Sequence, residues 1–248
     1  MTGVRIATFQ LCESPRYRIH FNMKLILVRH GETKENINHI TQGHSNSQLN
    51  EAGKVQAQKV AKRLENEKIN AAYSSDLDRC VSTAKEILKY HPSLMLHTTP
   101  ILREQGKGIF EGKPGSILHK VISKSDQQWY DYLPDGGETM RQVQERTKKF
   151  FEQLIITHND ETVLVVTHGG PMVCLFLLLF DKSFKEYKGY QPDNTAVTIL
   201  DIKSLENHQF LVLNDVKHLK QMNGPAATFT LTLQHKPAAL LFERGTSA

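Results

Sequence analysis

Two apolar segments that end in the same way constrain the fold of this chain more than any other feature. The sequence reads LILV-RHG from Leu25 and VLVVT-HGG from Val163. Short, nearly continuous apolar runs are typical of strands that are buried on both faces of a parallel sheet. Because ligands of such sheets bind at the carboxyl ends of the strands, we expect His30 and His168 to face each other across one pocket. A purely structural role for either histidine remains open at this point.

Segments typical of strands and of helices alternate along the rest of the chain. Asn50 is a candidate N-cap for the first helix, residues 101–115 are rich in glycine and charge and predict a loop, and residues 116–133 are compatible with a helix. The alternation predicts a three-layer α/β/α fold with a mostly parallel central sheet. The predicted strands are 24–28, 71–74, 93–98, 162–168, 195–202 and 209–216, and the predicted helices are 50–66, 76–90, 140–154 and one after residue 171.

The length of 248 residues is sufficient for one large domain with a sizeable core. We expect this folded domain to span residues 23–219. Residues 1–22 form an N-terminal extension, which carries arginines and few acids, so a weak targeting segment remains open. Residues 220–248 show a looser pattern and are expected to form a flexible C-terminal tail.

The composition argues against several classes of protein. The net charge of +5 comes from basic residues interspersed with acidic ones, which argues against nucleic-acid binding and suits a small anionic substrate. The longest apolar run, residues 172–180, is far shorter than the ~20 residues of a membrane-spanning helix. Cys12, Cys80 and Cys174 lack the spacing of metal ligands and predict a reduced, cytoplasmic protein. The histidines show no zinc-site pattern, so no metal is expected.

Two arginines and one glutamate can lie near the two histidines. Arg29 and Arg79 together would form a clamp for a phosphoryl group, because guanidinium groups bind its oxygens in a bidentate manner. On its own, Arg79 also fits a solvated position on a helix. Glu104 precedes a glycine-rich loop and can act as a general acid. It can equally be a loop glutamate that is paired with Arg103 or Lys107.

Six motifs of the chain resemble, in order, those of the histidine phosphatase superfamily, which has the phosphoglycerate mutase-like fold. The resemblance covers residues 23–219, and within the family the chain is most similar to the TIGAR-like branch of fructose-2,6-bisphosphatases. LNDVKHL, from Leu213, supports that branch less specifically. The six motifs are RHGETKEN from Arg29, QGHSNSQLNEAG from Gln42, SSDLDRCVSTA from Ser74, LREQGKGIFEG from Leu102, PDGGET from Pro134 and VVTHGG from Val165.

The resemblance implies a catalytic role for five residues. His30 would be the nucleophile that forms a phosphohistidine, and Glu104 would protonate the leaving alcohol and then accept a proton from water. Arg29, Arg79 and His168 would hold the phosphoryl oxygens and stabilise the charge of the transition state. No metal or other cofactor is implied, because the arginines supply the positive charge. The residues implied to contact the substrate are Asn36, Gln42, Gly43 and Gly169. Lys107 is a further candidate, because it lies close to Glu104 in the sequence.

The chain departs from the family pattern at two places. Relatives usually carry an aromatic or apolar residue near the position of Lys107. A lysine there would favour a second phosphate or a carboxylate on the substrate, or would point into water. Pro171 and Met172 stand where many relatives have an arginine, which we attribute to packing. Cys80 is expected to pack within its helix without a catalytic role.

Three functions are compatible with these residues. The first is a metal-independent phosphatase of small phosphorylated metabolites, with fructose 2,6-bisphosphate and regulation of glycolysis implied by the branch. The second is a cofactor-dependent phosphoglycerate mutase or bisphosphoglycerate phosphatase. Mutases resemble RHG-x-S-x-W-N, whereas this chain has Thr33 in place of the serine and no tryptophan before Asn36. The interval from Glu104 to His168 is 64 residues, which is shorter than the interval that mutases have. Both differences disfavour a mutase.

The third is a non-catalytic binding protein on the same scaffold, since a fold alone does not guarantee activity. It is disfavoured because all five expected catalytic residues are present. The expected partner is a small phosphorylated metabolite, with neither nucleic acid nor membrane, and a monomer is the simplest expectation.

Overall fold

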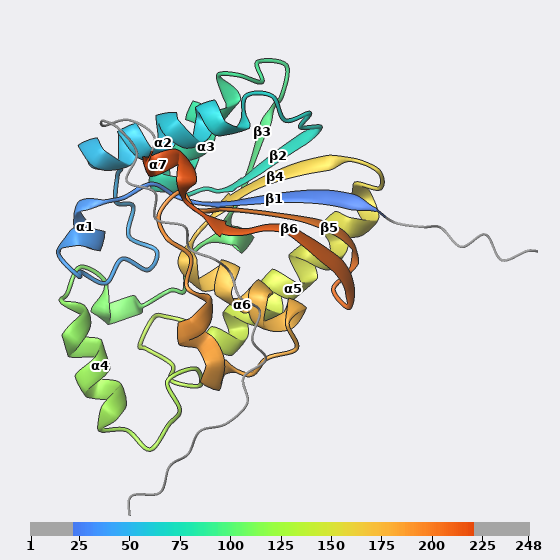
Figure 1. The fold of residues 1–248 in the computed structure, drawn as a ribbon. Helices are drawn as coiled ribbons and strands as arrows, with labels where there is room; N and C mark the ends of the chain where they lie inside the picture. The colour runs from blue at the N-terminus through green and yellow to red at the C-terminus, as the bar shows by residue number, and fades with distance from the viewer. Residues whose placement is uncertain (1–21, 221–248) are drawn as a thin grey trace, which may run out of the picture.

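Residues 22–220, which the computed structural model describes, form a six-stranded sheet between two layers of helices (Figure 1). The predicted N-terminal extension and C-terminal tail, and with them Cys12, lie outside the described residues except for Asn22 and Lys220. The strands are β1 (Met23–Arg29), β2 (Ala71–Ser75), β3 (Leu96–Thr99), β4 (Thr162–Thr167), β5 (Val197–Ser204) and β6 (Asn207–Asp215).

Helices connect and flank these strands. The α-helices are α1 (Lys34–Ile37), α2 (Glu51–Leu64), α3 (Asp78–Leu88), α4 (Gly115–Ser123), α5 (Met140–Thr157), α6 (Gly169–Leu179) and α7 (Lys217–Lys220). The 3₁₀-helices are η1 (Pro100–Leu102), η2 (Gly108–Phe110) and η3 (Phe184–Tyr190).

The sheet has the strand order β3-β2-β4-β1-β5-β6. The strands β3, β2, β4 and β1 are parallel to one another, whereas β5 is antiparallel to β1 and β6 is antiparallel to β5. The predicted three-layer fold with a mostly parallel sheet is therefore confirmed. All six predicted strands are present, with ends that differ from the prediction by up to three residues.

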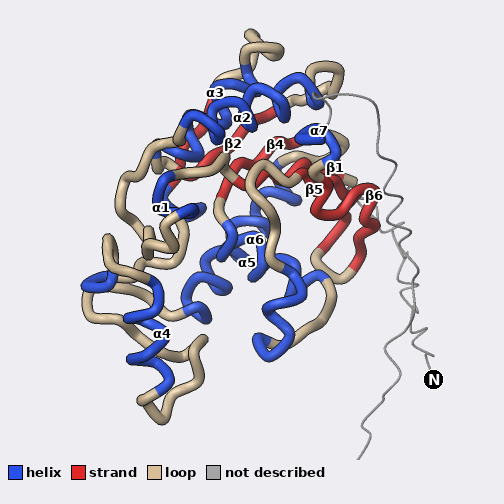
Figure 2. Tube along the Cα trace, turned by 60° about the vertical axis from the view of Figure 1, so that its left-hand side comes forward, coloured by secondary structure: helices blue, strands red, loops and turns tan. Residues whose placement is uncertain are grey.

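The side chains of β1 show why this strand is a continuous apolar run. Successive side chains of a strand point to opposite faces of the sheet. Leu25 and Leu27 pack into a core cluster with α5 and α6, whereas Ile26 and Val28 pack into a cluster with α2 and α3. Figure 2 shows these two helical layers on either side of the sheet. Because both faces are covered, residues 25–28 of β1 are all apolar, and the charged side chains of the strand stand near its two ends.

The helix signals of the sequence have mixed outcomes. Asn50 caps α2 as predicted, since its side chain accepts a hydrogen bond from Gly53 N at 2.7 Å. The predicted loop 101–115 contains the end of η1, all of η2 and the first residue of α4, and only residues 116–123 of the uncertain segment are helical. The pattern missed α1, η3 and α7, because helices of four to seven residues are too short to show a hydrophobic period. In Figure 2, α4 and its flanking loops stand apart from the sheet.

The turn after β1 packs tightly against the first turn of α2. A Cβ atom on Gly53 would lie only 2.0 Å from the carbonyl oxygen of Glu32, and one on Gly31 would lie 2.6 Å from the carbonyl oxygen of Gly53. Only glycine allows the two backbones to approach this closely. The glycine in RHG and the glycine in LNEAG are therefore halves of one contact.

Replacing Gly53 by alanine is expected to destabilise the fold by about 1–3 kcal/mol, because the added methyl overpacks a backbone contact that cannot yield. Urea denaturation measures the change. Gly189→Ala is the matched control, since a Cβ there meets no atom within 4 Å. Equal stability of the two variants would contradict the account of the contact.

The short helix α7 supports the end of β1 indirectly. His218 is buried, and its Nε2 lies 3.2 Å from Thr195 Oγ1. Thr195 N in turn donates to the carbonyl oxygens of Arg29 and His30, at 3.1 and 3.3 Å. Burial lowers the pKa of His218 to about 4, with Arg63 adding to the effect and Asp215 opposing it.

This shift predicts a pH-dependent stability. At pH above 6.5, His218 is neutral in the folded and unfolded chains and adds no pH dependence. As the pH falls from 6.5 to about 4, the unfolded chain takes up the proton first, so stability is lost in that window. The unfolding free energy of the parent should fall relative to that of His218→Gln over this window, as followed by denaturation at each pH. A difference between the two proteins that stays constant from pH 8 to 4 would refute the assignment.

Candidate active site

A cavity of about 860 Å³ lies at the carboxyl edge of the parallel strands. It is enclosed by the loops after β1 and β4, by the loop before η2, and by α4 and η3. Nine of the ten residues predicted from the sequence line it, so the structure brings segments far apart in the chain to one place. These nine are Arg29, His30, Asn36, Gln42, Gly43, Arg79, Glu104, Lys107 and Gly169.

His30 follows β1 and is held in one tautomer. Its Nδ1 lies 2.7 Å from the carbonyl oxygen of Gly31. Because a carbonyl only accepts, Nδ1 carries the proton and Nε2 keeps its lone pair. Burial, reinforced by the charges of Arg29 and Arg79, lowers the pKa of His30 well below its ordinary value. The ring is therefore neutral near pH 7 and is suited to act as a nucleophile.

His168 lies behind His30 and does not line the cavity. The two ring centroids are 5.1 Å apart, but only His30 lines the cavity, so the two histidines do not face each other across it as predicted. His168 Nδ1 accepts a hydrogen bond from Arg79 Nε at 3.2 Å, and its Nε2 lies 2.8 Å from Ser75 Oγ. Both ring nitrogens are thus engaged by the protein. Cys80, which was expected only to pack in its helix, is buried there with its Sγ 3.3 Å from His168 Nε2.

Arg79 is completely buried, so the alternative of a solvated helix arginine is wrong. Besides Nε, its Nη1 donates to Ser45 O at 2.8 Å and to Ser47 Oγ at 3.2 Å, and its Nη2 donates to Gly43 O at 2.9 Å. Four of the five N–H groups of a guanidinium are engaged in this way. Arg79 therefore fixes the loop after Gln42 while it places a positive charge beside His30.

Arg29 has a different set of contacts. Its Nη1 donates to Pro192 O at 2.7 Å, whereas its buried Nε has no hydrogen-bond partner among the residues described. A buried donor that stays unpaired costs free energy, more so on a charged group. An anionic oxygen in the cavity next to Nε would remove this cost.

Glu104 reaches the first turn of α6. Its Oε2 accepts from Gly170 N at 3.0 Å, and its Oε1 accepts from Gln105 N at 2.8 Å. A Cβ atom on Gly170 would lie 2.0 Å from Oε1, so only glycine leaves room for this carboxyl group. The alternative pairing with Arg103 is wrong, because Arg103 forms a two-pronged ion pair with Asp76.

Lys107 lines the cavity rather than pointing away from it. Its Nζ donates to Gln105 Oε1, and no carboxylate among the described residues lies within ion-pair distance of it. Burial lowers the pKa of Lys107, while Glu104 and two further glutamates oppose the shift. A partly buried ammonium group without a carboxylate partner is suited to binding an anionic group of a ligand.

Asn36 and Gln42 are held by their own loops. The Asn36 side chain accepts from Thr33 N at 3.1 Å and thereby completes the capping box of α1. Asn194 Nδ2 contacts the same oxygen at 3.5 Å and donates to His30 O at 2.9 Å. Gln42 Oε1 accepts from the hydroxyl of Ser47. Both amides thus lie at the cavity with part of their hydrogen-bonding capacity in use.

An apolar wall of the cavity was not predicted from the sequence. It comes from α4, the segment after it, the first residue of α5 and η3, and the ring centroids of Trp129 and Tyr187 lie 4.4 Å apart within it. The aromatic residues of the segment 116–133 were a usable signal, but its uncertain secondary structure concealed their direction. The wall consists of Leu118, Ile122, Trp129, Tyr132, Met140, Phe184 and Tyr187.

Residues 22–220 lack two features. No group of three or more His, Cys, Asp or Glu side chains in this part of the chain could hold a metal ion. Over the same residues, no helix has both the length and the apolar character that crossing a membrane requires.

Comparison with known proteins shows the family to which the chain is similar. A family model described as "Histidine phosphatase superfamily (branch 1)" matches residues 25–215. "Phosphoglycerate mutase-like protein 4" of Arabidopsis thaliana is 32% identical over 80% of this chain and 87% of its own length. "Metal-independent phosphoserine phosphatase" of the same plant is 35% identical over 64% of this chain and 70% of its own length.

A relative of the predicted branch matches a shorter stretch. "Fructose-2,6-bisphosphatase TIGAR" of Xenopus tropicalis is 39% identical over 52% of this chain and 49% of its own length. Among solved structures, Bacillus stearothermophilus YhfR superposes with a TM-score of 0.72 at 29% identity, over 79% of this chain and 99% of that one. Its likeness extends over nearly all of the described fold.

The tautomer of His30 can be tested directly. We expect ¹⁵N NMR of histidine-labelled protein to show a ring that is protonated at Nδ1 and unprotonated at Nε2, with no titration from pH 8 to 5.5. The physical reason is the combination of burial with two neighbouring positive charges, which opposes the imidazolium form. The signals lost in His30→Gln assign the ring. A titration with a midpoint at or above 6.5 would overturn this description.

Proposed function

The chain belongs to the histidine phosphatase superfamily (branch 1), and on this basis we propose that it hydrolyses small phosphorylated metabolites through a phosphohistidine on His30, with fructose 2,6-bisphosphate as its substrate. A phosphoric monoester hydrolase is the coarser activity that its phosphatase relatives support. The observation that carries the proposal is a neutral His30 with a free Nε2, in a cavity that also contains two arginines and Glu104.

The first chemical step transfers the phosphoryl group. His30 Nε2 attacks phosphorus while the bond to the leaving oxygen breaks, and the acid form of Glu104 gives its proton to that oxygen. The alcohol leaves, and Glu104 is left as a carboxylate. Arg29 and Arg79 stabilise the charge on the phosphoryl oxygens, and the unpaired Nε of Arg29 is a donor ready for one of them.

The second step regenerates the enzyme. Water gives a proton to the Glu104 carboxylate and attacks the phosphorus of the phosphohistidine, which releases inorganic phosphate and returns His30 to its starting form. Since both ring nitrogens of His168 are already engaged, His168 acts here by holding Arg79. Asn36, Gln42, Gly43 and Gly169 are proposed to contact the substrate, because each lines the cavity.

Lys107 supports a substrate with a second acidic group. Its ammonium group faces the cavity without a carboxylate partner among the described residues. The second phosphate of fructose 2,6-bisphosphate would fill this need, and hydrolysis of that metabolite would make the protein a regulator of glycolysis.

The length of the matches favours a second candidate substrate. The phosphoserine phosphatase relative aligns over 64% of this chain, against 52% for the relative named for fructose 2,6-bisphosphate. Phosphoserine also carries a carboxylate that Lys107 could bind. A mutase remains the third possibility, and it would need an added bisphosphoglycerate as phosphoryl donor.

The proposal predicts that purified protein releases phosphate from fructose 2,6-bisphosphate with a higher kcat/KM than from phosphoserine, 3-phosphoglycerate or 2,3-bisphosphoglycerate. His30→Ala should abolish release, because the variant lacks the ring nitrogen that attacks phosphorus. Glu104→Gln should slow it by about 10²–10⁴-fold, the usual contribution of a general acid, while vanadate still binds. Excess EDTA should leave the parent rate unchanged.

Each other result has a defined meaning. A higher kcat/KM for phosphoserine would keep the mechanism and discard the fructose 2,6-bisphosphate assignment. Turnover of 3-phosphoglycerate that requires 2,3-bisphosphoglycerate would make the protein a mutase. Full activity of His30→Ala would contradict the phosphohistidine mechanism.

A further inference from the structure

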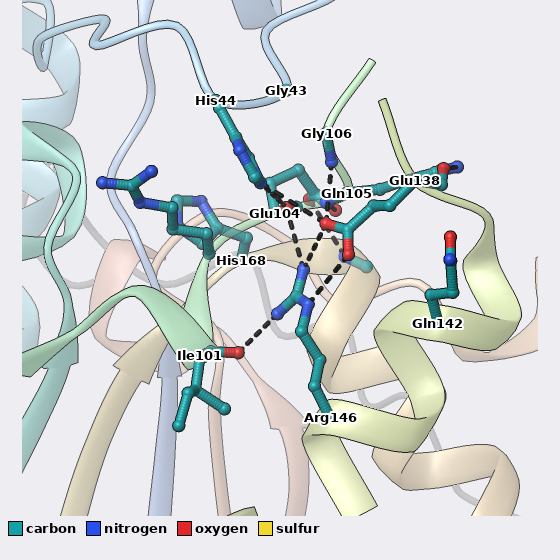
Figure 3. Close-up of polar contacts among 12 residues, drawn as sticks. Gly43, His44, Ile101, Glu104, Gln105, Gly106, Glu138, Gln142, Arg146 and His168 are labelled. Carbon is teal, nitrogen blue, oxygen red and sulfur yellow. Dashed lines mark hydrogen bonds and ion pairs between the residues drawn. The ribbon is translucent and has the colours of Figure 1, made fainter. Parts of the chain in front are cut away.

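Glu104, the proposed general acid, belongs to no helix or strand. Residues 103–106 form an irregular connection between η1 and the bridge at Lys107. A side chain on such a segment is precise only if other contacts fix its backbone. Three charged or titratable residues supply these contacts, and none of the three lines the cavity: Arg146 on α5, Glu138 in the PDGGET turn, and His44 in the loop after Gln42. We refer to them as the supporting cluster (Figure 3).

Arg146 contacts the backbone of the connection and that of η1 just before it. Its Nη2 donates to the carbonyl oxygen of Glu104 at 3.0 Å, and its Nη1 donates to that of Ile101. The same guanidinium binds Glu138 through Nη2 at 2.8 Å and through Nε at 3.1 Å. One planar group therefore ties the backbone of Glu104 to a helix and to a carboxylate.

Glu138 holds the two residues that follow Glu104. Its Oε1 accepts from Gly106 N at 2.9 Å, and its carbonyl oxygen accepts from Gln105 Nε2 at 2.6 Å. Burial alone would raise the pKa of Glu138, but the hydrogen bonds from Arg146 and Gly106 outweigh it and hold the pKa below its ordinary value. Glu138 is thus ionised at neutral pH and remains a strong acceptor.

His44 links the connection to the loop that Arg79 fixes. Its Nε2 lies 2.9 Å from the carbonyl oxygen of Glu104 and 3.4 Å from Glu138 Oε1. As in His30, contact with a carbonyl requires that this nitrogen donates. The carbonyl of Glu104 consequently accepts two hydrogen bonds, from Arg146 and from His44, and its orientation is fixed from two directions.

We propose that Arg146 and Glu138 are positioning residues, which hold the backbone of Glu104 so that its carboxyl group can transfer a proton to the leaving oxygen. The inference rests on the proposed function, because it assigns these residues to the step in which Glu104 protonates the alcohol. With its backbone fixed, the Glu104 side chain accepts from Gly170 N and lines the cavity. Without the fork of Arg146, the carboxyl group moves and proton transfer slows.

A purely structural role makes a different prediction. Loss of a half-buried ion pair lowers stability whatever the pair supports, and a general distortion of the site would slow every substrate equally. Loss of a positioned acid slows only those reactions in which the leaving group needs a proton. Phenyl phosphate needs it, whereas p-nitrophenyl phosphate releases an acidic phenol and needs it much less. The ratio of kcat/KM for the two compounds therefore reports the acid alone, since kcat/KM reflects the first phosphoryl transfer.

The experiment compares Arg146→Met with the parent on these two phosphate esters, at full chain length. We expect kcat/KM for phenyl phosphate to fall by about 10²-fold, the lower end for loss of a general acid, and kcat/KM for p-nitrophenyl phosphate to fall only a few-fold. Glu104→Gln should give the same pattern. Arg146→Lys should recover part of the loss, because it keeps the charge but not the fork.

Arg63→Met is the matched control. Arg63 forms an ion pair with Asp215 at 2.9 Å, with side-chain exposures of 20% and 16%, against 2.8 Å, 20% and 19% for Arg146 and Glu138. It lies outside the cavity, so both rates should stay at the parent value while stability falls. Thermal unfolding of each variant measures that fall.

The outcomes separate the inference from the function on which it rests. Equal losses for the two esters in Arg146→Met, or losses matched by Arg63→Met, would reject the positioning role and leave the phosphatase intact. If the parent hydrolysed neither ester in a manner that depends on His30, the proposed function and the inference would both fall. Glu138→Gln, which keeps the shape of the side chain, provides the same comparison if Arg146→Met does not fold, and an unchanged ratio there would also reject the proposal.

Discussion

The rest of the site depends on the hydrogen bonds of the buried guanidinium group of Arg79. It has no exposed surface, and it joins α3 to His168 after β4 and to the carbonyl oxygens of Gly43 and Ser45. A charge in such a place is tolerated only when its hydrogen bonds are satisfied. The hydrogen bonds that satisfy the buried charge also fix one wall of the cavity. The same contacts therefore stabilise the arginine and shape the pocket.

The charges around His30 explain both its protonation state and the chemistry of the cavity. Arg29 and Arg79 disfavour a third positive charge, which keeps the imidazole neutral and leaves Nε2 free. They also leave an excess of positive charge near an unpaired Nε of Arg29. A bound anion would offset this excess, and in the proposed reaction the phosphoryl group of the substrate is that anion. His30, the proposed nucleophile, follows a central strand of the sheet, whereas Glu104, the proposed acid, stands on an irregular segment and depends on the side chains that hold it.

The sequence by itself determined the layers of the fold and nine of the residues that line the cavity. The apolar runs specified strands buried on both faces, because side chains of a strand alternate with a period of two and both faces needed covering. Local signals such as the Asn50 cap also held, since a cap depends on residues three positions apart. Strand ends then placed Arg29, His30 and the glycines at one edge. These features share a dependence on neighbours that are close in the sequence.

The tertiary structure alone decided how those residues are used. Whether the nitrogens of His168 face the cavity depended on Ser75 and Arg79, which lie 93 and 89 residues away. The contact of Arg146 with the Glu104 carbonyl spans 42 residues, and the direction of the aromatic wall depended on where α4 packs. Hydrogen bonds between segments that are far apart in the chain do not produce a periodic pattern in the sequence. The residues and their approximate place could be predicted from the chain, but the tautomers, the hydrogen-bond partners and the support of the acid required the packed fold.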